Sequence, residues 1–112
     1  MADKTTDKIT DYNDFWPYYL REHGKPATRG LHYIGTALAL LCLVFGLLGN
    51  AAYLIAVPFA GYGFAWVAHF FVEHNKPATF TYPGWSLYSD FRMFALAVTG
   101  RLKPHLEAAG LA

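Results

Sequence analysis

The chain of 112 residues contains a single cysteine, Cys42, and this scarcity excludes several classes of site. One thiol cannot form an internal disulfide, a Cys-x-x-Cys redox pair or a cysteine-rich zinc site. Because Cys42 lies inside an apolar stretch, we expect it to be a packing residue. The His-Glu-x-x-His pattern of zinc proteases is also absent from the sequence.

Charged residues are scarce as well. They make up 15% of the chain, against 54% hydrophobic and 18% aromatic residues, a composition more apolar than that of ordinary soluble domains. The formal net charge is +1 and the basic residues are scattered, so no nucleic-acid partner is expected. The first apolar run begins only at about residue 30, which favours a retained membrane anchor over a cleaved secretory signal.

The apolar stretch of residues 30–72 contains no Asp, Glu, Lys or Arg. Within it, residues 33–49 and 51–72 give spans of about 26 and 33 Å at 1.5 Å per residue, enough to cross a hydrocarbon core of about 30 Å. Gly49 and Asn50 form a turn signal between them. We therefore predict an all-α integral membrane protein with a two-span helical hairpin. A soluble helical bundle is the alternative, but its helices would need a polar face.

The charge distribution predicts the orientation of this hairpin. Its short turn carries no charge, whereas basic residues gather at its open end. By the positive-inside rule, the open end and its histidines face the cytoplasm. The basic residues at the open end are Arg21, Lys25, Arg29, Lys76, Arg101 and Lys103.

Two shorter helices are predicted outside the hairpin. Residues 14–22 form an aromatic-rich amphipathic helix, interrupted by Pro17 near its start, whose side chains favour the headgroup layer. Residues 86–99 form a last helix with Asp90 and Arg92 as its only charges, so we expect it to be interfacial or partly inserted.

The remaining C-terminal segment offers little pattern. From Gly100 onward we expect a loosely ordered tail, with Pro104 beside a solvated His105. Residues 1–112 are interpreted as one membrane domain with a core of about residues 12–103. The sequence does not fix an oligomeric state.

A near-repeat brackets the apolar stretch, Glu-His-Gly-Lys-Pro-Ala-Thr at 22–28 and Glu-His-Asn-Lys-Pro-Ala-Thr at 73–79. Since a hairpin returns the chain to its starting side, the two polar segments should meet there. The four imidazoles expected to converge at one membrane level are those of His23, His32, His69 and His74. A break at Pro26 lets the chain fold back and bring His23 towards His32.

Individual residues at this end suggest a metal site. His69 and Glu73 are four apart and share one face of a helix, which fits either a ligand pair or a hydrogen-bonded helix end. Imidazole and carboxylate suit Fe(II), Zn(II) or Mn(II), and the lack of thiolates disfavours structural zinc. Arg29 can bind a substrate carboxylate or a lipid phosphate. His74 is a weaker candidate because it points away from Glu73 on a helix.

Several motifs, including the nine-residue gap between His23 and His32, occur together in this chain. They are Glu22-His23 with Arg29, Leu31-His32-Tyr33-Ile34-Gly35, Gly61-Tyr62-Gly63-Phe64-Ala65-Trp66, Ala68-His69-Phe70-Phe71 with Glu73, and Asn75-Lys76-Pro77-Ala78-Thr79-Phe80 with Tyr82-Pro83. Over about residues 12–103 this pattern resembles the Mpo-like membrane proteins, also described as domain of unknown function 962.

That resemblance implies an Fe(II)-dependent dioxygenase that shortens 2-hydroxy fatty acids by one carbon. It implies His23, His32 and His69 as iron ligands, O2 as co-substrate, and a long-chain 2-hydroxy acid or another lipid as partner. Glu73 would be a fourth ligand or an orienting group, and Arg29 would hold the substrate headgroup. On ligand types alone, Zn(II) or Mn(II) stays open.

Two other functions compete with this interpretation. The hairpin can be a non-enzymatic element for assembly or lipid binding, in which the histidines hydrogen-bond helix ends. A bis-histidine haem site is disfavoured, because no spacing places two imidazoles opposite each other across a porphyrin.

Overall fold

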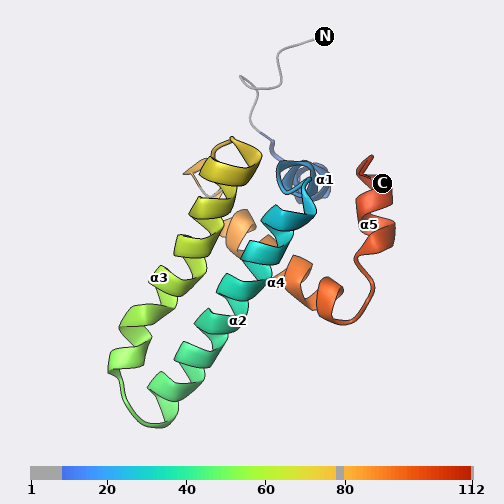
Figure 1. Ribbon diagram of the computed structural model, residues 1–112. Helices are drawn as coiled ribbons and strands as arrows, with labels where there is room; N and C mark the ends of the chain where they lie inside the picture. The colour runs from blue at the N-terminus through green and yellow to red at the C-terminus, as the bar shows by residue number, and fades with distance from the viewer. Residues whose placement is uncertain (1–8, 78–79, 112) are drawn as a thin grey trace.

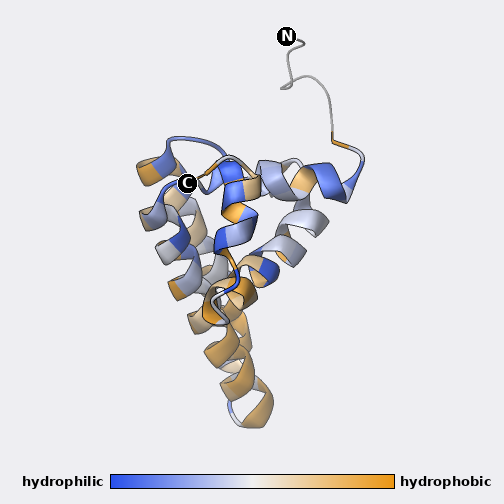
Figure 2. Cartoon of the chain, turned by 90° about the vertical axis from the view of Figure 1, so that its right-hand side faces the viewer, coloured by the Kyte–Doolittle hydropathy of each residue, from blue (hydrophilic) through white to orange (hydrophobic). Residues whose placement is uncertain are grey.

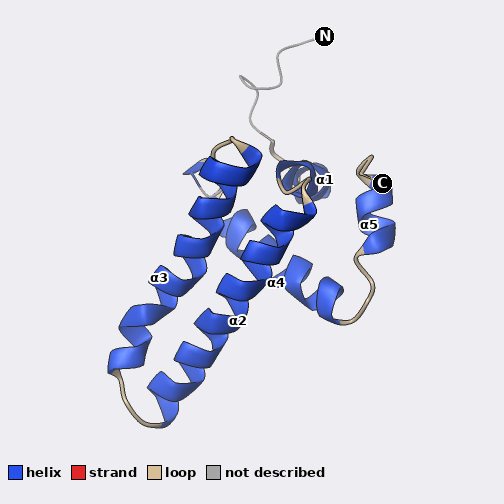
Figure 3. Ribbon diagram, in the orientation of Figure 1, coloured by secondary structure: helices blue, strands red, loops and turns tan. Residues whose placement is uncertain are grey.

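The computed structural model describes residues 9–77 and 80–111, and the regular elements within these ranges are all helices (Figures 1 and 3). The predicted all-α class is therefore confirmed. In chain order the elements are α1 (Tyr12–Glu22), α2 (Pro26–Leu48), α3 (Ala52–Val67), the π-helical segment η1 (Ala68–Glu73), α4 (Pro83–Val98) and α5 (Lys103–Ala108). Ala78 and Thr79, which end the second copy of the near-repeat, lie outside the described residues.

Helices α2 and α3 form the predicted antiparallel hairpin (Figure 1). Pro26 occupies the first turn of α2, where its missing N–H and fixed φ favour a helix start. α2 therefore begins ahead of the predicted span. Two continuous helical segments, Pro26–Leu48 and Ala52–Glu73, are long and apolar enough to cross a membrane, with mean hydropathies of 2.1 and 1.5.

The hairpin turns its apolar side chains outward. Leu48 is 81% exposed and Phe59 74%. In each candidate span only 17% of the most apolar 18-residue stretch is buried. A core helix of a soluble bundle would bury such residues, so the exposure favours a lipid environment. Figure 2 shows the hydrophobic colouring concentrated towards the hairpin tip and the hydrophilic colouring at the opposite end.

The buried core lies at that opposite end, between α1, α4 and α5. Its largest members are Phe15, Trp16 and Tyr19 of α1 and Met93 of α4. Contrary to the sequence prediction, α1 is not interrupted at Pro17 but runs through it. Proline removes one backbone donor from the helix, and burial of the neighbouring aromatic side chains compensates for that loss.

The C-terminal tail is also part of this core, so the prediction of a loosely ordered segment was wrong. Leu102 and Ala109, at the two ends of α5, are each only 7% exposed. His105 is not simply solvated, because its Nδ1 accepts a hydrogen bond of 3.0 Å from Trp16 Nε1. These contacts fix α5 against α1.

Both charges of α4 have partners within the protein. The Tyr19 hydroxyl donates to Asp90, and the Arg92 guanidinium lies 4.2 Å from the centroid of the Trp16 ring. Cation–π contacts of this kind are favourable where the cation is partly desolvated. α4 is thereby attached to α1, which places Asp90 beside the open end of the hairpin.

Candidate metal centre

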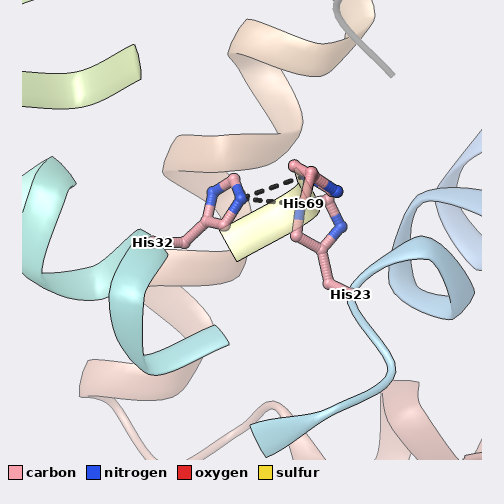
Figure 4. Close-up of side chains that lie close together, drawn as sticks. All are labelled: His23, His32 and His69. Atoms are coloured by element: carbon pink, nitrogen blue, oxygen red, sulfur yellow. Dashed lines mark hydrogen bonds between the residues drawn. The ribbon is translucent and has the colours of Figure 1, made fainter. Parts of the chain in front are cut away.

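Three histidines from three different elements meet at the open end of the hairpin (Figure 4). His23 is the C-cap of α1, His32 lies in α2, and His69 lies in η1. Their Nε2 atoms form a triangle with edges of 3.0 Å for His23 to His32, 3.0 Å for His23 to His69 and 3.3 Å for His32 to His69. The three residues are 1%, 5% and 1% exposed, respectively.

The second ring nitrogen of two of these histidines faces an acceptor. Nδ1 of His23 lies 2.7 Å from the carbonyl oxygen of Tyr19, and Nδ1 of His69 lies 2.7 Å from Oδ1 of Asn75. The Asn75 amide is oriented by its Nδ2, which donates to the carbonyl oxygen of Glu22. Nδ1 is therefore the protonated nitrogen in both rings, and Nε2 carries a lone pair.

This arrangement leaves acceptors facing each other, which fits a bound metal ion. The Nε2 atoms of His23 and His69 are 3.0 Å apart, and with Nδ1 protonated in both rings neither ring can donate to the other. A cation between them would satisfy both lone pairs and that of His32. If all three nitrogens bound one ion at about 2.1 Å, the observed nitrogen–nitrogen distances would correspond to nitrogen–metal–nitrogen angles of about 90–105°.

Burial favours the neutral imidazole ring that metal binding requires. Burial, followed by the proximity of His32 and His69, holds the pKa of His23 well below its ordinary value. Burial raises the pKa of Asp90 to about 6, against the opposing effect of its hydrogen bond from Tyr19. Asp90 Oδ1 lies 3.7 Å from Nδ1 of His32, so its negative charge favours the proton on that nitrogen and the lone pair on Nε2.

Glu73 and Arg29 stabilise the turns that carry the histidines. A Glu73 carboxylate oxygen accepts a hydrogen bond of 2.8 Å from Thr28 Oγ1 and another from the backbone N–H of Lys25. It thus lies at the N-terminus of α2, where a helix favours negative charge. Arg29 Nη1 donates to the carbonyl oxygens of His23 and Gly24, at 2.9 and 3.0 Å.

The two copies of the near-repeat contact each other, as the sequence predicts, but not all their histidines converge. Asn75 of the second copy bonds Glu22 of the first, and Lys25 of the first bonds Glu73 of the second. His74 does not join the triad. It ends η1 in the left-handed conformation, with φ of 62°, and is exposed, because the chain must turn there out of the helix.

Two neighbouring cavities adjoin the triad. The smaller, of about 10 Å³, is lined by the three histidines together with Trp66 and Ser86. The larger, of about 230 Å³, lies between α2, α3 and α4 and is mostly apolar. His32, Tyr62 and Asp90 line both cavities. A ligand with a small polar end and a long apolar part would match this pair.

Sequence reasoning missed Asn75, Ser86 and the role of Asp90. A lone acidic residue in an apolar helix is a signal of function, and Asp90 was noted only as a charge in need of a partner. Asn75 stands where the first copy of the near-repeat has Gly24. This single difference between the copies is a weak signal of a separate role for Asn75. Nothing in the local sequence around Ser86 distinguishes it.

One comparison with known proteins gives a match. A protein-family model described as "2-hydroxy-palmitic acid dioxygenase Mpo1-like" matches residues 9–102 of the chain. No curated protein and no solved structure matches it.

Proposed function

The chain belongs to the 2-hydroxy-palmitic acid dioxygenase Mpo1-like family, and on that premise we propose that it is a membrane dioxygenase acting on long-chain 2-hydroxy acids. The observation that carries the proposal is the triangle of Nε2 atoms with edges of 3.0–3.3 Å. The lone pairs of His23 and His69 face each other without a proton on either nitrogen, and the triangle adjoins an apolar cavity. These features support a metal site next to a binding site for an acyl chain.

In this proposal His23, His32 and His69 would hold one Fe(II) ion. Bound Fe(II) supplies the redox chemistry that reaction with O2 requires, which Zn(II) lacks. Tyr19, Asn75 and Asp90 keep the imidazoles oriented through their Nδ1 atoms.

Glu73 and Arg29 act by positioning. Glu73 holds the end of η1 against the start of α2, which fixes His69 relative to His32. Arg29 holds the turn after α1 through the carbonyl oxygen of His23. Neither residue lines either of the two cavities, so both act through the histidines they support.

The reaction shortens the acid by one carbon. The C1–C2 bond breaks, C1 leaves as carbon dioxide, and C2 becomes the carboxyl carbon of the shorter acid. One O2 accepts the four electrons released, and one water forms, so that atoms and electrons balance. The apolar cavity between α2, α3 and α4 accommodates part of the acyl chain near the triad, and the exposed apolar faces of the hairpin keep the site at the membrane that supplies the lipid.

Metal content and oxygen uptake test the proposal together. The protein, purified without a histidine tag and loaded with Fe(II) under anaerobic conditions, is expected to bind about one iron per chain. After addition of O2 and 2-hydroxy-palmitic acid, it should consume one O2 for each C15 acid formed. His69→Ala should lose both the iron and at least about a hundredfold in uptake rate, since removing a metal ligand removes the site.

His74→Asn is the matched control, because it changes a nearby exposed histidine outside the triad and asparagine tolerates the left-handed conformation. It should retain iron and activity. A wild-type protein without stoichiometric metal, or with uptake unaffected by His69→Ala, would contradict the proposal. That result would favour the non-enzymatic hairpin, whose exposed apolar faces suit assembly or lipid binding.

A further inference from the structure

Ser86 has a buried hydroxyl without a hydrogen-bond partner, and no other described side chain shares this property. The residue lies in the first turn of α4 and is only 1% exposed. Buried polar groups in proteins are nearly always paired, and an unpaired one lowers stability. A buried hydroxyl kept at such a cost suggests that its partner is a ligand.

Ser86 is one of the residues that line the small cavity adjoining the histidine triad. With a volume of about 10 Å³, that cavity has room for a group about the size of one water molecule. Asp90, one turn further along α4, lines the same cavity. Among the described residues, no lysine or arginine lines either cavity.

This charge distribution selects which part of a 2-hydroxy acid can lie beside Ser86. A metal ion held by the histidines would be a positive charge at this cavity and would attract the carboxylate, whereas beside Ser86 a carboxylate would face the negative charge of Asp90. A hydroxyl is neutral and of suitable size, and it can both donate to and accept from a serine hydroxyl.

We propose that Ser86 is a specificity residue that hydrogen-bonds the 2-hydroxyl of the substrate and so orients C2 towards the triad. This inference rests on the proposed function. An unsubstituted fatty acid offers no group to Ser86 and leaves the serine hydroxyl unpaired. Sites built to bond a substrate hydroxyl reject analogues lacking it for this reason.

Equilibrium binding tests the inference without turnover. The full chain, metal-loaded in detergent micelles and free of oxygen, is titrated with 2-hydroxy-palmitic acid or with palmitic acid. Tryptophan fluorescence reports binding, since Trp66 lines the small cavity. The wild type is expected to bind the 2-hydroxy acid about tenfold more tightly, the value of roughly one hydrogen bond. Ser86→Ala should bring that ratio close to one.

Ser89→Ala is the matched control. Ser89 is fully buried on the same helix, but its Oγ lies 2.8 Å from the Tyr12 hydroxyl. The substitution should lower thermal stability and leave the binding ratio unchanged. Ser86→Ala removes no internal hydrogen bond and should unfold at a temperature no lower than the wild type. Ser86→Cys, a weaker donor of similar size, should lower the ratio in the same way.

The possible failures are distinguishable. If the wild type prefers the 2-hydroxy acid and Ser86→Ala keeps the full preference, Ser86 does not recognise the 2-hydroxyl and the inference is overturned while the proposed function stands. If the wild type binds both acids equally, the 2-hydroxyl is not recognised at the binding step and the inference is overturned while the proposed function stands. If it binds neither acid, the proposed function fails and the inference fails with it.

Discussion

At the scale of single residues, the geometry of the triad depends on the hydrogen bonds made by Nδ1, the ring nitrogen that points away from the centre of the triad. Backbone or side-chain oxygens lie 2.7 Å from Nδ1 of His23 and His69, which fixes both tautomers and ring orientations. Asn75 contributes twice, because its backbone N–H also donates to the carbonyl oxygen of His69 at 2.8 Å. The strength of metal binding should therefore depend on residues that never touch the metal.

Replacement of Asn75 by alanine tests that dependence. Because His69 loses the acceptor of its Nδ1 proton, the affinity for Fe(II) or Zn(II) is expected to fall about 10- to 100-fold. Competition with a chromophoric chelator measures the change. Asn50→Ala, in the turn at the far end of the hairpin, should leave the affinity as it is, and equal affinities for Asn75→Ala and wild type would rule out the orienting role.

At the scale of elements, the distance between α2 and α3 sets the distance between His32 and His69. The helices approach closely at Gly35, one turn after His32. A Cβ at that position would lie 2.9 Å from the carbonyl oxygen of Ala60 and 2.9 Å from Cβ of Phe64. Because one of these atoms belongs to the backbone, it cannot move aside without shifting α3.

Gly35→Ala is accordingly expected to push α3 away from α2. Overpacking of this kind costs about 1–3 kcal/mol, and the affinity for metal should fall with it, since His32 is drawn away from His69. Thermal unfolding in detergent and chelator competition measure the two effects. Gly63→Ala is the control, because nothing lies within 4 Å of a Cβ there. It should change neither the unfolding temperature nor the metal affinity. Matching results for the two variants would contradict close packing at Gly35.

At the scale of the whole molecule, polar and apolar parts are separated along the hairpin (Figure 2). The buried core and the triad occupy the end where α1, α4 and α5 gather, while the opposite end exposes leucine and aromatic side chains. In a bilayer the apolar part is the part that inserts. The turn at Asn50 and the loop at Lys76 should then emerge on opposite sides.

Cysteine labelling measures this arrangement. In a Cys42→Ser background, single cysteines at Asn50 and Lys76, both exposed, are treated with a membrane-impermeant maleimide in intact cells. The positive-inside rule predicts that the cysteine at 50 reacts in intact cells and that the one at 76 reacts only after permeabilisation. Labelling of both positions from the same side would exclude a two-span hairpin.

The sequence by itself determined the hairpin, because the hydropathy of residues 30–72 and their lack of charged side chains can be read locally, without knowing which distant residues they contact. Together with the family resemblance, it also pointed to His23, His32 and His69, which the structure brings together. The loose tail and the interruption at Pro17 were wrong predictions, since burial against distant residues overrode local signals.

Only the tertiary structure decided how the triad is supported and what it faces. Tyr19 and Asp90 lie 71 positions apart, and Trp16 meets His105 across 89. The Glu73 carboxylate accepts hydrogen bonds at the N-terminus of α2, from the backbone N–H of Lys25 and from Thr28. The packing of α4 places Ser86 at the small cavity. Such contacts depend on how helices pack in three dimensions, which residue spacing along one chain does not specify.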